Sequence, residues 1–136
     1  MSVVPKEIDF RSGRINLRNM AQYCHLPLYI DTYEFVKCVY QIVRQFRKEY
    51  KYSLGMELQQ IIWQTLDEII KTNSLPDSQK KVGIEKISLN FDKFKIRLRF
   101  AYEIGLITDT KFTTAQQKME EIGKMIGGWG KWAQLT

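Results

Sequence analysis

The chain has 136 residues, of which 44% are hydrophobic and 26% are charged, and this supports one domain with a buried core. No apolar run approaches the roughly 18 residues of a membrane helix, and the N-terminus has no apolar signal-peptide core, so we expect a cytoplasmic protein without a membrane partner. The net charge of +6 suits a polyanion such as RNA or DNA, although many small basic proteins bind no nucleic acid.

Residues 1–30 are less regular than the rest, and we expect an N-terminal arm followed by a helical domain over residues 31–134. Pro27 should end any short helical turn in this arm. The segment from Arg11 to Asn19 contains three arginines and no acidic residue. The arm could therefore dock on a neighbouring protein or on phosphates, and an undocked tail is the alternative.

A helix is expected over about residues 31–50, because apolar residues recur there at alternating spacings of three and four. Cations gather near its C-terminal end. They suit the negative end of the helix dipole, which is one explanation of the cluster, and phosphate binding is the other. The residues concerned are Arg44, Arg47, Lys48 and Lys51.

A second helix is expected over about residues 54–72, where Ser53 is placed to cap the first turn and a broad apolar stripe follows. Trp63 lies beside the centre of that stripe, where it could face a neighbouring subunit. A polar loop with Pro76 ends the helix.

The third helix, expected over about residues 77–104, is apolar on two sides. Leu89, Ile96 and Phe100 fall nearly opposite its core face, at about 100° of rotation per residue. A single bundle can bury one such face, so we expect self-association through these residues, with the N-terminal arm as the alternative cover. The cations on its flanks form either a solvated rim or a track for phosphates, and they include Lys93, Arg97 and Arg99.

Glycine marks the end of the third helix. Gly105, followed by an apolar pair, is typical of a helix C-cap. Thr113 and Gln116 resemble a capping box, which predicts a last helix over about residues 113–132.

The last helix is expected to close the bundle. Gly123 and Gly127 lie four residues apart, beside an apolar face that ends in Trp129. A glycine inside a helix costs about 1 kcal/mol relative to alanine, so two at this spacing predict that another backbone approaches closely.

Four helices with short connections, and no stretch of period-two alternation, predict an all-α, antiparallel up-down four-helix bundle without a sheet. His25 is the single histidine and stands next to Cys24, which favours packing over a metal or nucleophile role. No metal-ligand spacing and no acid-base pair is found in the sequence. We therefore expect no catalytic residue, no metal and no cofactor.

Three stretches resemble the four helix bundle protein family. The opening helix and its turn carry Phe46-Arg47-Lys48-Glu49-Tyr50-Lys51-Tyr52-Ser53-Leu54-Gly55, and the third helix carries Lys95-Ile96-Arg97-Leu98-Arg99. The closing signature, which is the most specific of the three, is Glu121-Ile122-Gly123-Lys124-Met125-Ile126-Gly127-Gly128-Trp129. The resemblance covers about residues 26–132, and the N-terminal arm is similar to an extension that some members carry.

That family has two main branches, the accessory variability protein of diversity-generating retroelements and the protein encoded by intervening sequences in bacterial 23S ribosomal RNA genes. The resemblance implies a homopentameric barrel of four-helix bundles with a basic surface. In the retroelement branch it also implies binding to the reverse transcriptase and to template RNA or an RNA/DNA hybrid, in support of mutagenic reverse transcription. The arm and the tyrosine-rich first turn favour this branch, in a bacterial or prophage-encoded protein. A structural oligomer without a nucleic-acid role is the alternative.

Overall fold

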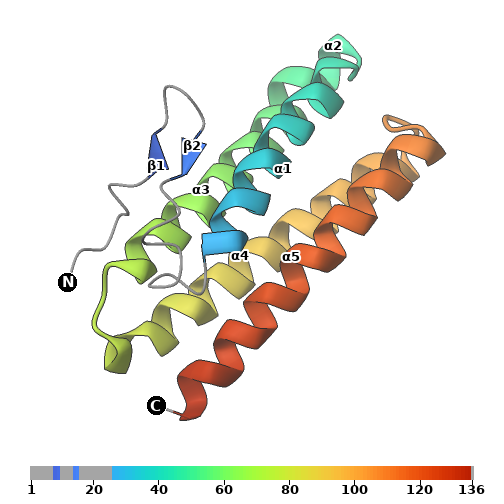
Figure 1. Ribbon diagram of the computed structural model, residues 1–136. Helices are drawn as coiled ribbons and strands as arrows, with labels where there is room; N and C mark the ends of the chain where they lie inside the picture. Colours follow the sequence, from blue (N-terminus) through green and yellow to red (C-terminus); the bar gives the residue numbers. More distant parts are fainter. Residues whose placement is uncertain (1–7, 10–13, 16–25, 136) are drawn as a thin grey trace.

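Four long helices carry the fold of the computed structural model, which describes residues 8–9, 14–15 and 26–135 (Figure 1). A short helix and a π turn join the first two long helices, and a 3-10 turn precedes the third. In chain order the helical elements are α1 (Leu26–Arg44), α2 (Lys48–Tyr50), the π turn η2 (Lys51–Gly55), α3 (Met56–Asn73), η3 (Asp77–Gln79), α4 (Lys80–Glu103) and α5 (Asp109–Leu135).

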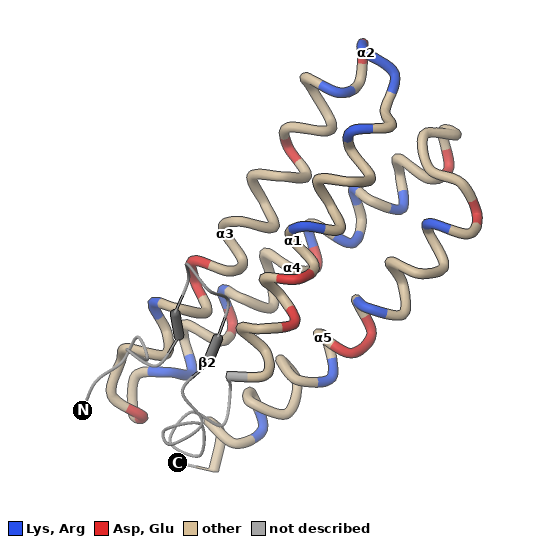
Figure 2. The backbone as a smooth tube through the Cα atoms, turned by 45° about the horizontal axis from the view of Figure 1, so that its top comes forward, with Lys and Arg blue, Asp and Glu red and all other residues tan. Residues whose placement is uncertain are grey.

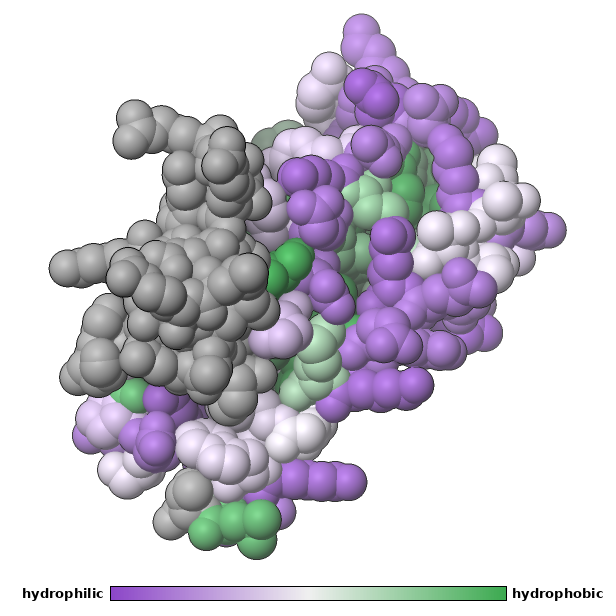
Figure 3. All heavy atoms as spheres, viewed as in Figure 1, coloured by the Kyte–Doolittle hydropathy of each residue, from purple (hydrophilic) through white to green (hydrophobic). Residues whose placement is uncertain are grey.

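The long helices form a bundle, as the sequence predicts. α1 packs on α3 and α5, and α4 packs on the same two helices. Figure 1 shows the α1–α3 connection and the α4–α5 connection at the same end of the molecule, with the C-terminus at the other end. We call the end that carries these two connections the α2 end. On the face seen in Figure 3, most side chains are hydrophilic, and hydrophobic atoms show in a strip between α1 and α5.

The core lies along the centre of the bundle and draws on all four long helices. Phe35 of α1 meets Phe94 of α4 edge to face, with ring centroids 5.4 Å apart. Val39 and Leu58 are completely buried beside them. The alternating spacings of three and four therefore mark the buried faces correctly, because they place side chains on one side of a helix.

The first helix begins and ends earlier than expected. α1 starts at Leu26, so Pro27 lies in its first turn instead of ending a helix. Proline fits there because the first amides of a helix have no carbonyl partner within it. At the other end Gln45 and Phe46 donate backbone hydrogen bonds to the carbonyls three residues earlier, and Arg47 is extended (ψ 149°).

The chain re-enters helix through α2 and η2. Ser53 lies inside η2 and its hydroxyl donates to the carbonyl of Glu49 (3.1 Å), so the expected capping role of Ser53 is wrong. Gly55 closes η2 against α1, because a Cβ at Gly55 would lie 2.6 Å from Val43 Cγ1 and 3.5 Å from Phe46 Cδ2. Only glycine allows this close approach without movement of α1.

The α4–α5 link confirms one expectation and corrects another. Gly105 has φ 86°, the Leu106 amide donates to the Ala101 carbonyl (2.9 Å), and the Gly105 amide donates to that of Tyr102 (3.0 Å), which together form a Schellman C-cap. α5 then begins at Asp109, four residues before the expected start. Thr108 caps it, because its hydroxyl oxygen accepts from the Lys111 amide (3.3 Å), so the capping box expected at Thr113 and Gln116 is wrong.

Two very short strands lie ahead of the bundle. β1 (Ile8–Asp9) pairs with β2 (Arg14–Ile15) in an antiparallel ladder, with Ile8 opposite Ile15. The expectation of no sheet is wrong at this point, because strands of two residues are too short to show an alternating pattern. Arg11, Arg18, Cys24 and His25 of the arm lie outside the described residues. Over the described helices, none is both long and apolar enough to cross a membrane.

Candidate functional site

Four cations occupy the α2 end of the bundle, and we call them the basic end. Arg44 is the last residue of α1, Arg47 precedes α2, Lys48 begins α2, and Lys51 begins η2. Figure 2 shows the Lys and Arg positions gathered around α2. Arg44, Arg47 and Lys48 are exposed and Lys51 is half-buried. Because α1 ends at Arg44, the other three cations lie beyond its last turn. The dipole of α1 therefore explains only the position of Arg44.

Few carboxylates balance the positive charge of the basic end. Arg47 Nε lies 3.8 Å from Glu49 Oε1, which is at the outer limit of an ion pair. Within the part of the chain that the structure describes, no carboxylate forms an ion pair with Arg44, Lys48 or Lys51. The local excess of positive charge attracts anions most strongly at low ionic strength.

The cations predicted on the third helix are placed differently. Arg97 Nε pairs with Glu57 Oε1 (3.1 Å) across the contact between α4 and α3, and Arg99 Nε pairs with Glu103 Oε2 (3.0 Å) along α4. Lys93 is exposed, and its carbonyl accepts from Arg97 Nη1 (3.1 Å). The seven predicted residues thus fall into two groups. The basic end has few carboxylates near its charges, whereas two of the three cations on α4 form close ion pairs.

One face of α4 carries an exposed apolar row, formed by Val82 (59% exposed), Leu89 (56%), Ile96 (68%) and Phe100 (51%). We call it the α4 row. The opposite face is fully buried at Ile87. The expected two-sided helix is therefore confirmed, and the partner that would cover the α4 row remains a prediction.

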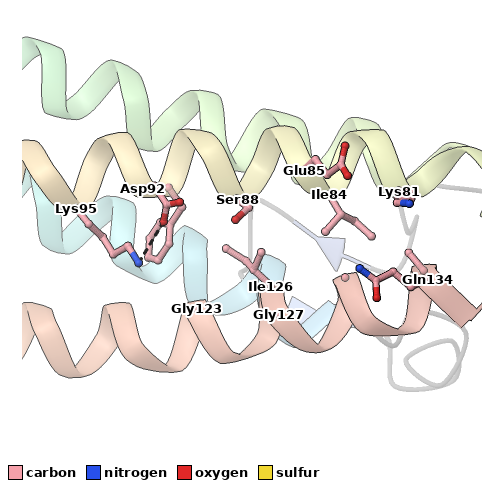
Figure 4. Close-up of a pocket in the computed structure, with 13 residues that line it drawn as sticks. Lys81, Ile84, Glu85, Ser88, Asp92, Lys95, Gly123, Ile126, Gly127 and Gln134 are labelled. Atoms are coloured by element: carbon pink, nitrogen blue, oxygen red, sulfur yellow. Dashed lines mark ion pairs between the residues drawn. The ribbon is translucent and has the colours of Figure 1, made fainter.

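Gly123 and Gly127 of α5 are not tightly packed among the residues that the structure describes. A Cβ built at either of them meets no described atom within 4 Å, and both residues line a groove of about 270 Å³ between α4 and α5. Figure 4 shows Ser88 and Ile126 at this groove, with the Asp92–Lys95 ion pair at its side. The predicted close approach of another backbone is therefore not found among residues 26–135. Trp129 does pack into the core, with 5% of its surface exposed.

An aromatic cleft lies next to the basic end, and the sequence did not identify it as a site. Trp63 Nε1 donates to the Tyr40 hydroxyl (2.8 Å) and the two rings meet edge to face. The idea that Trp63 could face a neighbouring subunit stays a prediction. Beside them a cleft of about 440 Å³ opens between α1 and the η2–α3 segment. The aromatic cleft is lined by Tyr40, Gln41, Val43, Arg44, Lys51, Tyr52, Met56 and Gln59.

A signal for the cleft was present in the sequence. Tyr52, Met56, Gln59 and Trp63 follow one another at spacings of four, three and four, which is typical of one helix face. The apolar residues of α3 that face the core form a broader stripe. That stripe dominates the sequence pattern, so the second pattern was not recognised. The partner face on α1, which completes the cleft, can be recognised only when the two helices are placed together.

Among the described residues, three groups have raised pKa values, and none of them belongs to the basic end or lines the aromatic cleft. Burial, assisted by Tyr33, raises the pKa of Tyr29 to about 12. Burial also raises the pKa of the Cys38 thiol, and Lys118 partly offsets this. The hydrogen bond to Asp109 (2.7 Å) raises the pKa of Tyr102, whose ring stacks on Phe112. In the described segments no three His, Cys, Asp or Glu residues come together as metal ligands.

Comparison with known proteins gives one result. A family model described as bAvd-like matches residues 28–133, which is most of the chain and includes the basic end, the α4 row and the aromatic cleft. No curated protein and no solved structure matches the chain.

Proposed function

The chain belongs to the bAvd-like family, and from this membership we propose that it is a non-catalytic accessory protein of a diversity-generating retroelement. In this role it binds the reverse transcriptase and its template RNA, or an RNA/DNA hybrid, and supports mutagenic copying. The description of the matching family as bAvd-like supports this role over that of the 23S ribosomal RNA intervening-sequence protein. The role requires no catalytic residue, metal or cofactor in this chain.

The observation that best supports nucleic-acid binding is the excess of positive charge at the basic end. Arg44, Lys48 and Lys51 have no acidic ion-pair partner in the described part of the chain, so their charges can neutralise phosphates without first breaking a salt bridge. Contacts of this kind give affinity with little base readout. The paired residues Arg97 and Arg99 contribute less, because their carboxylate partners would repel a phosphate.

We also propose that the helices form an antiparallel up-down bundle whose copies assemble into a homopentameric barrel. The α4 row supports this, because four large apolar side chains on one exposed face are a poor surface for an isolated subunit. A closed ring repeats the basic end once per subunit. Several weak phosphate contacts then act together, which raises the avidity for a long RNA.

Salt-dependent binding of single-stranded RNA tests the nucleic-acid role. The triple variant Arg44→Glu, Lys48→Glu, Lys51→Glu should lose binding at low salt and keep its helical circular dichroism spectrum. Its control, Lys111→Glu, Lys124→Glu, Lys131→Glu, makes the same charge change at exposed positions of α5 and should retain most of the affinity. For the wild-type protein, the logarithm of affinity should fall linearly with the logarithm of salt concentration. Binding that does not respond to salt would disprove the proposed basic surface.

Co-purification tests the protein partner. The chain and a retroelement reverse transcriptase would be co-expressed, with an affinity tag on the polymerase, and isolated after nuclease treatment. A stable complex is expected under these conditions. Its absence both with and without added template RNA would contradict the accessory role.

A further inference from the structure

The aromatic cleft carries exposed tyrosines on a well-packed wall. Tyr52 is 67% exposed and Tyr40 44%, so aromatic rings face solvent at the mouth of a cavity of about 440 Å³. The hydrogen bond from Trp63 fixes Tyr40 in place. Gly55 fixes the position of the η2 segment that carries Tyr52, because it packs that segment against Val43. Both sides of the cleft are therefore held in place by contacts between α1 and the η2–α3 segment.

The charged side chains that line the cleft are basic, and the other polar side chains include two amides. Arg44 and Lys51 are part of its wall, and none of the described residues that line it is acidic. Gln41 and Gln59 add side-chain amides, which carry both hydrogen-bond donors and an acceptor. An occupant must therefore offer an apolar or aromatic surface together with negative charge.

We propose that the aromatic cleft binds single-stranded nucleic acid, with one base stacked against Tyr52 and the adjoining phosphates on Arg44 and Lys51. This deepens the proposed function and rests on it, because it assigns the strand state of the nucleic acid that the basic end holds. Aromatic rings next to cations are the usual arrangement for binding single strands, since every base has a face that can stack.

The geometry favours a single strand over a duplex or a protein segment. In a duplex the bases are stacked on one another, and inserting one into the cleft would require it to leave the helix at a cost of a few kcal/mol. An apolar protein segment would fill the cleft but would leave Arg44 and Lys51 without a counter-charge. A single strand supplies both the flat ring and the phosphates.

Fluorescence anisotropy with a short labelled oligouridylate, and with a duplex RNA of the same length, tests this assignment. Tyr52→Ala should weaken oligouridylate binding by roughly 5- to 150-fold, the range typical of losing one stacked base, and should leave duplex binding unchanged. Tyr52→Phe should bind like the wild type, because the ring is kept. Tyr52→Leu should bind like Tyr52→Ala, because it keeps apolar area but loses the aromatic face.

The salt dependence separates this inference from the proposed function. Tyr52→Ala should keep the wild-type salt slope, whereas Lys51→Ala should reduce it by about one. Equal oligouridylate affinities for Tyr52→Ala and the wild type, alongside a loss in Lys51→Ala, would overturn the cleft and leave the basic end intact. A change in sedimentation of Tyr52→Ala without a change in affinity would assign the cleft to a second protein copy and would also overturn it. Absence of any RNA binding by the wild type would overturn both.

Discussion

Gly83 of α4 lies directly against Thr72 of α3. A Cβ at Gly83 would stand 2.9 Å from Thr72 Cβ and 2.8 Å from its Cγ2, and both residues are buried. Threonine branches at Cβ, so its side chain cannot turn away without placing another atom in the same space. The contact between α3 and α4 therefore depends on a glycine at this position.

We expect Gly83→Ala to destabilise the protein by about 1–3 kcal/mol, because the added methyl overpacks a rigid contact. Helix propensity alone would favour alanine, so a net loss reports the steric clash. Urea unfolding followed by circular dichroism measures the change. Adding Thr72→Ala should recover part of the loss, since it removes the Thr72 hydroxyl and Cγ2 that the new methyl meets and leaves only Cβ. Equal stability of Gly83→Ala and the wild type would contradict the close contact.

Gly123→Ala should have the opposite effect. A methyl at Gly123 meets nothing within 4 Å, so the helix gains about 0.5–1 kcal/mol from the better propensity of alanine. The same unfolding experiment measures it, and Gly83→Ala serves as the contrasting variant. A clear destabilisation by Gly123→Ala would show that a surface beyond residues 26–135 packs on α5 at the groove.

These glycines show what the sequence could and could not predict. The cost of an interior glycine indicates that each one has a reason, but it does not identify the neighbour. The regular spacing of Gly123 and Gly127 favoured them as the tight contact, whereas the tight contacts lie at Gly55 and Gly83. Both depend on side chains of another helix, Val43 and Thr72, whose positions follow only from the packed bundle.

Helix existence was more predictable than helix ends. The four long helices and the Gly105 cap follow from periodicity and local turn chemistry, which act over a few residues. The break after Arg44 does not, because the heptad pattern continues through Phe46 and Tyr50. Phe46 still reaches the core after the helix has ended, so the apolar spacing is satisfied by a different backbone path.

The clustering of cations at the basic end was predictable from the sequence, whereas the contacts around them were not. Sequence clustering identified all four cations of the basic end. It grouped the cations of α4 with them, because ion pairs such as Arg97 with Glu57 join positions far apart in the chain. It also separated Trp63 from Tyr40, whose hydrogen bond exists only across the α1–α3 contact.

The α4 row makes a prediction about assembly. Ile96→Glu places a charge in the centre of the row, which would be buried and unpaired in a subunit interface. We expect a folded but smaller species in light scattering, with circular dichroism like that of the wild type. Gln117→Glu is the control, because it adds the same charge at an exposed position of α5 and should not change the mass. A wild-type protein that is already a monomer would rule out the interface.

Alkaline stability depends on Tyr29, which lies buried in α1 with its ring stacked on that of Tyr33. Its pKa is raised to about 12 in the folded protein, above the value of 10.0 for an unperturbed tyrosine. The folded state therefore holds this proton more tightly than the unfolded state. The resulting stabilisation is complete below pH 10.0 and is lost as the pH rises toward 12.

We expect the free energy of unfolding of the wild type to fall more steeply than that of Tyr29→Phe between these two pH values. Urea unfolding of both proteins at several alkaline pH values measures the difference, and the comparison cancels the lysines and other tyrosines that titrate in both. Tyr52→Phe is the control, because it removes the same hydroxyl at an exposed position. Parallel curves for the wild type and Tyr29→Phe would show that Tyr29 ionises in the folded protein as readily as in the unfolded chain.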